Sequence, residues 1–240
     1  MSLYFLIPCK SLRHGKSRLA PIVSSADRQQ LCARLLRNSL ALALALQPVD
    51  KVSVITSDPE AKAIADDHGV GTIDDGGACL NEALRRGRAS MTAKQGRERA
   101  VIILPIDLAY ATPGAIARAI RPDLDVALVP DEGRQGTNLL YIGPRAWPLF
   151  TFAFGPNSFL AHRSLAEQAG FRVAVIEEPL LAFDMDWKDK PPVNRQMGEY
   201  YLELERLGYT VDIEEWPISQ GKGLDDLLAS GHKPSVIREG

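Results

Sequence analysis

The sequence predicts a three-layer α/β fold built on a mostly parallel, doubly wound sheet. Short apolar runs alternate with longer segments of helical periodicity, which is the pattern of repeated strand–helix–strand units. The run at residues 99–105 (RAVIILP) is almost entirely apolar, as expected of a central parallel strand that helices cover on both faces. The chain has 240 residues, of which 45% are hydrophobic and 24% charged, so it is long enough to bury such a core.

The expected elements follow one another in strand and helix order. Strands are predicted at 3–9, 51–57, near 72, 99–105, 125–130, 138–142, 171–176 and 180–183. Helices are predicted at 26–47, 58–69, from 77 through 86, from 112 onward and at 157–170. Ser24 or Ser25 is the expected cap of the first helix. Asp58 before Pro59 is a typical N-cap with proline at the first helical position.

The domain organisation predicted is one α/β domain at 1–186 and an atypical C-terminal extension at 187–240. The composition changes after Asp186, and residues 188–192 (KDKPP) form the expected junction. The extension reads as a helix, a strand and a short helix, at 193–207, 209–216 and 224–229. We expect it to pack on the first domain or to continue it.

Charge, cysteine and hydropathy patterns favour a cytoplasmic protein without a membrane or nucleic-acid partner. With 28 Lys and Arg against 30 Asp and Glu, the net charge is −2, which argues against a broad nucleic-acid surface. No apolar run is long enough to cross a membrane, and the start lacks the features of a signal peptide. Cys9, Cys32 and Cys79 form no CxxC pair, so neither a disulfide framework nor a zinc site is expected. The sequence leaves the oligomeric state open, with a homodimer as one alternative.

A basic loop directly after the first strand is the first candidate for chemistry. Residues 8–19 (PCKSLRHGKSRL) contain Lys10, Arg13, Lys16 and Arg18. Cations and free backbone amides after a strand suit a triphosphate. The segment is not a Walker A motif, because Lys10 stands where that motif needs a glycine. A solvated basic loop is the alternative.

Three aspartates at predicted strand ends are candidate metal ligands. Asp107 follows the apolar run at 99–105, and Asp184 and Asp186 end the apolar run at 180–183. Alternation in an extended segment would place Asp184 and Asp186 on one side, where a divalent cation would remove their mutual repulsion. The alternatives are a turn or cap aspartate for Asp107 and a surface DxD for the pair.

Two further loops combine glycines with hydroxyl side chains. Residues 131–138 (DEGRQGTN) hold Arg134 and Thr137, and residues 154–159 (FGPNSF) hold Gly155 and Ser158 before a helix. Arginine, hydroxyls and free amides suit a phosphate or a carboxylate. The alternatives are a hairpin turn for the first loop and a simple N-cap for the second.

Taken in order, these motifs resemble those of the guanylyltransferases of coenzyme F420 biosynthesis, the 2-phospho-L-lactate or phosphoenolpyruvate guanylyltransferases. The resemblance covers about residues 3–186 and rests on PCKSLRHGKSRLAP, LNEAL, LPIDL, PDEGRQGTNLL, FGPNSF with a following His, and DMD. It implies a nucleotide-diphospho-sugar-transferase-like (GT-A) fold, Mg²⁺, and transfer of GMP from GTP to a small phosphorylated acid with release of pyrophosphate. The implied acid is 2-phospholactate, phosphoenolpyruvate or 3-phosphoglycerate, and the sequence does not distinguish among these three.

The resemblance also implies roles for individual residues. The triphosphate would contact Lys10, Lys16 and Arg18, of which Lys16 and Arg18 would stabilise the transition state. The guanine and ribose would lie near Asn81. The metal ligands would be Asp107, Asp184 and Asp186, with Asp107 counted among the catalytic residues. The acceptor would be held by Thr137, Ser158, Gly155 and Arg134.

Two departures from the family pattern leave alternatives open. Ala109-Tyr110 stands where a second proline is usual, and Trp187-Lys188 follows the DxD instead of the usual Asp-Thr-Pro-Glu. Residues 182–230 weakly resemble a Toprim-like domain, which would make the protein nucleic-acid-associated. A molybdenum-cofactor-type nucleotidyltransferase is disfavoured by Cys9-Lys10-Ser11 in place of a glycine-rich loop. A nucleotide-binding regulator without turnover is the remaining alternative.

Overall fold

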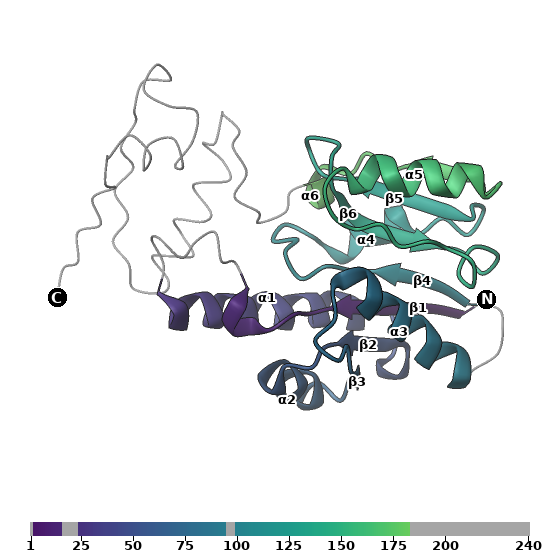
Figure 1. The fold of residues 1–240 in the computed structure, drawn as a ribbon. Helices are drawn as coiled ribbons and strands as arrows, with labels where there is room; N and C mark the ends of the chain where they lie inside the picture. The colour runs from purple at the N-terminus through teal and green to yellow at the C-terminus, as the bar shows by residue number, and fades with distance from the viewer. Residues whose placement is uncertain (1, 16–23, 95–98, 183–240) are drawn as a thin grey trace, which may run out of the picture.

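The computed structural model describes residues 2–15, 24–94 and 99–182, which form a seven-stranded sheet with helices on both faces (Figure 1). The strand order is β3-β2-β1-β4-β6-β5-β7. The strands are β1 (Ser2–Pro8), β2 (Val52–Ile55), β3 (Gly71–Ile73), β4 (Arg99–Ile103), β5 (Val126–Pro130), β6 (Thr137–Ile142) and β7 (Val173–Val175). Strand β6 is antiparallel to both its neighbours, and the other pairings are parallel. The predicted mostly parallel α/β sheet is therefore confirmed.

Helices connect the strands and cover the sheet. They are α1 (Ser25–Leu44), α2 (Pro59–Asp67), α3 (Leu80–Lys94), α4 (Pro113–Ala119), α5 (Ser158–Gln168) and the short α6 (Pro179–Ala182). Two 3₁₀ turns, η1 (Leu12–His14) and η3 (Val49–Lys51), complete the described elements. No helix among the described residues is long and apolar enough to cross a membrane.

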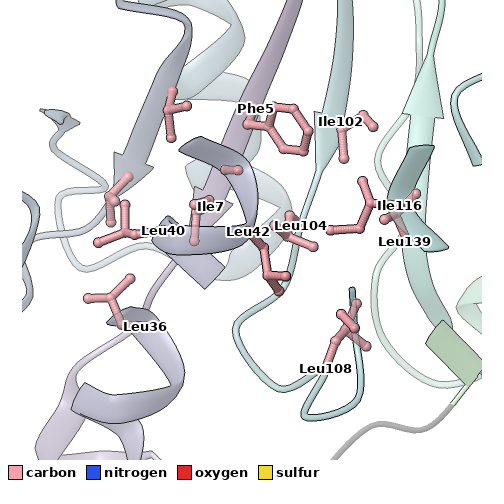
Figure 2. Close-up of a cluster of buried hydrophobic side chains, with 14 of the residues drawn as sticks. Phe5, Ile7, Leu36, Leu40, Leu42, Ile102, Leu104, Leu108, Ile116 and Leu139 are labelled. Carbon is pink, nitrogen blue, oxygen red and sulfur yellow. The ribbon is translucent and has the colours of Figure 1, made fainter. Parts of the chain in front are cut away.

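Two apolar cores lie on opposite faces of the sheet, which makes the fold three-layered. Alternation along β1 sends Phe5 and Ile7 to one core and Leu6 to the other. The first core packs the strands against α1, α2 and α4. Figure 2 shows Leu40 of α1 near Ile7 of β1, and Ile116 of α4 near Leu104 and Leu139. The second core packs them against α3 and α5. Because both faces of the sheet are buried, the central strands β1 and β4 are apolar along most of their length.

Three predicted helix starts are confirmed. The Ser24 hydroxyl accepts a hydrogen bond from the Asp27 backbone, and Thr112 does the same for Ala115. Asp58 caps α2 by accepting from two backbone amides, with Pro59 at the first helical position. Each cap satisfies amides that would otherwise lack a partner, so local sequence was sufficient to place these boundaries.

One predicted element is wrong. Residues 180–182 do not form a strand but belong to α6. The carboxylate of the buried Glu178 pairs with Arg118, and the Glu178 carbonyl accepts from the amides of Leu181 and Ala182 at 2.9 and 3.0 Å. Pro179 occupies the first helical position, where its missing N–H costs nothing. A short apolar run cannot be assigned to strand or helix by periodicity, and tertiary pairing of Glu178 decided it here.

Other predicted boundaries shift by a few residues. Helix α3 continues past Arg86 to Lys94. Within it, Gly87 lets the helix approach the sheet closely, because a Cβ there would lie 2.6 Å from Cδ1 of Ile55. All three cysteines are free thiols. The boundary at 186 and the extension at 187–240 lie outside the described residues and stay predictions.

Candidate active site

The functional candidates gather at the edge of the sheet where the parallel strands end. In the register, Pro8 at the end of β1 lies beside Ile55 at the end of β2, and Ile103 at the end of β4 pairs with Leu140 in the middle of β6. Because β6 runs the opposite way, its first residues lie at the edge where the other strands finish. Ligands of open α/β sheets bind at this edge.

The loop after β1 is anchored to the start of α2. The Leu12 backbone amide donates to the Asp58 carboxylate at 3.0 Å. Burial opposes ionisation of Asp58, but hydrogen bonds from Ala61, Ser11, Leu12 and Glu60 outweigh it and hold the pKa below its usual value. Asp58 is therefore an anion that fixes the first turn of the loop while it caps a helix.

Lys10 lies exposed at the start of this loop, as its predicted role requires. Lys16 and Arg18 lie outside the described residues, so their roles stay predictions. The neighbouring Cys9 is buried, and burial, with Cys32 next in effect, raises the pKa of its thiol to about 12. Cys9 is thus a protonated thiol near neutral pH and offers no nucleophile to the site.

The predicted acceptor residues Thr137 and Ser158 do lie together, although they are 21 positions apart in the chain. The Thr137 backbone amide donates to the Ser158 hydroxyl at 3.0 Å. The Thr137 hydroxyl lies 2.9 Å from Nδ1 of His162, whose Nε2 lies 2.9 Å from the Ala153 amide. All three side chains are buried. Ser158 is therefore not an N-cap; it joins α5 to β6.

Gly155 makes the turn that leads into α5. Its φ of +142° lies in a region that favours glycine, and an added Cβ would meet nothing within 4 Å, so conformation rather than space requires the glycine. The Gly155 carbonyl accepts from the Ser158 amide at 3.1 Å, and the next amide, that of Phe159, donates to the Gln135 carbonyl at 3.0 Å. The two predicted glycine-bearing loops are thereby joined.

Arg134 lies at the tip of the hairpin between β5 and β6. Its guanidinium forms an ion pair with Glu177 and lies 5.2 Å from the ring centre of Phe159. Its φ of +53° is left-handed. Residues 131–136 therefore form the hairpin turn that the sequence offers as the alternative interpretation of this motif. The Arg134 guanidinium already has a carboxylate partner in Glu177. Contact between Arg134 and an acceptor stays a prediction.

The side-chain amide of Asn81 binds the backbone of the loop that precedes Gly155. Its Nδ2 donates to the Phe154 carbonyl at 2.9 Å, and its Oδ1 accepts from the Phe154 amide at 2.8 Å. Two turns of α3 further along, Arg88 donates to the Phe150 carbonyl at 2.6 Å and lies over the ring of Phe152. The first turns of α3 thus support residues 150–154. A role for Asn81 near guanine and ribose stays a prediction.

The predicted metal ligands are only partly described. Asp107 lies half-buried in the turn that follows β4. Asp184 and Asp186 lie outside the described residues. Within the described ranges, no three His, Cys, Asp or Glu side chains come together to hold a metal ion.

Asn138 ties the chain that leads to Asp184 and Asp186 to the sheet. Its Nδ2 donates to the carbonyls of Leu181 and Ala182, both at 2.9 Å, and the Glu132 amide donates to Ala182 as well. The Ala182 carbonyl, two residues before Asp184, is therefore held beside β6, the strand next to β4.

Two of these residues were not assigned roles from the sequence. In the sequence, His162 is only the histidine that follows the FGPNSF motif, and Asn138 is only the last residue of the DEGRQGTN motif. Their partners, Thr137 and Ala182, are 25 and 44 positions away. A histidine one turn into a helix that begins Gly-Pro-Asn-Ser was the available signal, but nothing local shows which strand it faces.

The sheet order and the site edge define the fold class of nucleotide-diphospho-sugar transferases and cytidylyltransferases. A 4-diphosphocytidyl-2C-methyl-D-erythritol synthase shares the fold with a TM-score of 0.54 at 15% identity, over 85% of this chain and 97% of that one. A glucosyl-3-phosphoglycerate synthase from Mycobacterium tuberculosis gives a TM-score of 0.51 at 13% identity, over 74% and 69%. The predicted GT-A-like fold is confirmed.

Sequence comparison narrows the class to one family. A family model described as guanylyl transferase CofC like matches residues 3–199. A phosphoenolpyruvate guanylyltransferase from Rubrobacter xylanophilus is 33% identical over 189 residues, covering 78% of this chain and 90% of its own. One from Roseiflexus castenholzii is 34% identical over 191 residues, covering 79% and 86%. The chain belongs to the CofC-like guanylyltransferase family, which confirms the predicted guanylyltransferase.

The family match also extends into the C-terminal part of the chain. It continues to residue 199 and so includes Asp184 and Asp186. The Toprim-like resemblance at 182–230 falls almost wholly outside the described residues and finds no support in the fold or the family match.

Proposed function

We propose that this chain transfers GMP from GTP to phosphoenolpyruvate in the biosynthesis of coenzyme F420. An oxygen of the acceptor phosphate attacks the α-phosphorus of GTP in line. A new phosphorus–oxygen bond forms, the bond between the α-phosphorus and the bridging oxygen breaks, and pyrophosphate leaves. Two relatives named phosphoenolpyruvate guanylyltransferase, which this chain matches over 90% and 86% of their lengths, support phosphoenolpyruvate over 2-phospholactate and 3-phosphoglycerate.

The observation that carries the proposal is the pair of buried hydroxyls at Thr137 and Ser158 beside the Gly155 turn. They lie at the same edge of the sheet as the loop that begins with Lys10, and β4, which leads to Asp107, lies between β1 and β6 in the strand order. Hydroxyls and helix-start amides suit the carboxylate and phosphate of a small acid, whereas cations suit a triphosphate. The two reactants would then meet over Asp107.

The nucleotide side of the site would be formed by Lys10, Lys16 and Arg18. Their charges would oppose the triphosphate charge and stabilise the departing pyrophosphate. Asn81 would shape the site through Phe154 and would lie near the guanine and ribose. Asp58 supports this side by fixing the start of the basic loop through Leu12.

Asp107, Asp184 and Asp186 fit a divalent cation by their donor chemistry. All three offer carboxylate oxygens, which Mg²⁺ prefers. When bound, Mg²⁺ supplies charge neutralisation at the α-phosphate. Asn138 supports this assignment, because it holds Ala182, two residues before Asp184, to the strand beside β4. The assignment of each carboxylate is part of the proposal.

The reaction as proposed needs no general base. The acceptor phosphate is a dianion near neutral pH, so its oxygen attacks without losing a proton. Cys9 stays protonated, as its raised pKa requires. Burial lowers the pKa of His162 to about 4 and both its ring nitrogens have partners, so it takes no proton from the reactants.

The test is pyrophosphate release with Mg²⁺ from GTP, ATP and CTP, each with phosphoenolpyruvate, 2-phospholactate, 3-phosphoglycerate or no acceptor. We expect release only from GTP with phosphoenolpyruvate. Release with another of the acids would keep the reaction and correct the acceptor. GTP binding without release from any pair would overturn the proposed transfer and favour a regulator.

A further inference from the structure

We propose that His162 is a positioning residue that makes the Thr137 hydroxyl a hydrogen-bond donor toward the acceptor acid. The inference rests on the proposed function, because it concerns the same acceptor residues. The imidazole of His162 lies between a backbone amide and a side-chain hydroxyl. We expect this arrangement to fix the tautomer of the ring and to decide which substitutions of His162 the acceptor site tolerates.

The imidazole is held in one orientation. His162 is fully buried, and its ring lies edge-on to Phe154 with 4.6 Å between ring centres and 5.7 Å from that of Phe150. The Ala153 amide lies 2.9 Å from Nε2, and the Thr137 hydroxyl lies 2.9 Å from Nδ1. Both ring nitrogens are therefore engaged, on opposite sides of the ring.

The backbone amide determines the tautomer. An N–H group can only donate, so Nε2 must accept and carries no proton. A neutral imidazole has one proton, which is then on Nδ1 and must be donated to Thr137 Oγ1. Burial favours this neutral ring by lowering the pKa of His162 to about 4.

Two fixed donors set the direction of both hydroxyl groups. Thr137 Oγ1 accepts from Nδ1, which leaves its own O–H to donate elsewhere. Ser158 Oγ accepts from the Thr137 amide, which leaves the Ser158 O–H to donate as well. Two adjacent hydroxyls with a donor to spare match a phosphate or carboxylate, whose oxygens accept. With the other tautomer, Nδ1 would compete for the Thr137 proton.

Three substitutions separate the tautomer from simple packing. Asn at position 162 can place its amide near Nδ1 and still donate to Thr137. Gln reaches the position of Nε2, so it can accept from Ala153 but loses the donor to Thr137. Phe keeps the ring volume and removes both bonds. We expect H162Q and H162F to raise the phosphoenolpyruvate KM about tenfold or more and H162N to raise it about threefold or less, with the GTP KM unchanged in all three.

Equal losses in H162N and H162Q, or a GTP KM that rises with the acceptor KM, would overturn the proposal. Nitrogen NMR of the wild-type imidazole near neutral pH gives a second test that needs neither variant nor activity. We expect a protonated Nδ1 and an unprotonated Nε2, and a proton on Nε2 would refute the inference. If the wild type transfers GMP to no acid but the tautomer is as stated, the proposed function fails while the hydrogen-bond arrangement stands. Titration of phosphoenolpyruvate into wild-type and H162Q protein then decides whether the arrangement binds an acid.

Discussion

At the scale of single residues, the site depends on side chains that serve as fixed donors or acceptors. Thr137 uses its backbone amide toward Ser158 and its hydroxyl toward His162. Asp58 uses both carboxylate oxygens on backbone amides. Such groups lose little entropy when a ligand arrives, because folding has already ordered them.

The Thr137 hydroxyl can be removed almost without a change in shape. We expect T137V to raise the acceptor KM about tenfold, the equivalent of about 1.4 kcal/mol, and to leave the GTP KM within about twofold. T137S keeps the hydroxyl and is the matched control. Steady-state kinetics with each substrate varied in turn measures both values. An acceptor KM as low in T137V as in T137S would remove Thr137 from the acceptor site.

His162 also makes folding stability depend on pH. Its pKa falls from 6.5 to about 4 on folding, so the unfolded chain binds more protons between these values. The stabilising contribution is present above about pH 6.5 and is lost as the pH falls towards 4. The difference in unfolding free energy between wild type and H162N, which has no titrating ring, should shrink by about 3 kcal/mol over that range. Denaturant unfolding at several pH values measures it, and a constant difference would contradict the neutral buried ring.

At the scale of elements, short contacts between distant segments build the site. Asn81 and Arg88 join α3 to residues 150–154, and Asn138 joins β6 to α6. Residues 150–154 lie outside any helix or strand, and α6 is only four residues long. Their positions depend on side-chain amides and a guanidinium that satisfy backbone carbonyls.

Asn138 gives the clearest test at this scale. N138D keeps the shape but removes both donors and turns carboxylate oxygens toward the carbonyls of Leu181 and Ala182. We expect a loss of about 2–4 kcal/mol in unfolding free energy, because two carbonyls lose their donor and a charge is buried. Q168E, an amide-to-acid change at the exposed end of α5, is the matched control and should lose less than about 0.5 kcal/mol. Equal unfolding midpoints for the two variants would show that Asn138 does not hold α6.

At the scale of the whole molecule, the reversed strand β6 brings the two halves of the site together. The loop from β1 and the turn after β4 lie at the ends of parallel strands. Thr137 and Asn138 come from the beginning of a strand, and only its antiparallel direction places them at the same edge. The hairpin between β5 and β6 makes this reversal.

Asp107, on the turn after the central strand β4, tests whether this edge is the catalytic centre. We expect D107N to lose at least about a hundredfold in kcat for GMP transfer, because charge neutralisation at the α-phosphate needs the carboxylate. The melting temperature should stay within about 2 °C, since the change is isosteric. Pyrophosphate release and thermal unfolding measure the two. D184N and D186N, assayed separately, assign the other two carboxylates, and wild-type turnover in D107N would exclude Asp107.

The sequence by itself determined the fold class, the helix starts at Ser24, Asp58 and Thr112, and the family. These follow from the periodicity of side chains, from caps that act within three residues, and from motifs whose order the chain preserves. Through the family resemblance it also predicted one acceptor site that contains Thr137 and Ser158. The structure brings the two residues into contact, and their role stays a prediction. The prediction of a strand at 180–183 is wrong, because a short apolar run has no local signal strong enough to distinguish a strand from a helix.

Only the tertiary structure decided the α6 helix and the partners of Asn81, Asn138 and His162. Each of these depends on a contact between residues far apart in sequence: Asn81 with Phe154 is 73 positions away, and Asn138 with Ala182 is 44. Hydrogen bonds of this kind form only after the sheet has brought distant loops to one edge. Local spacing carries no record of them, because a side chain's partner is chosen by the packing of the whole fold.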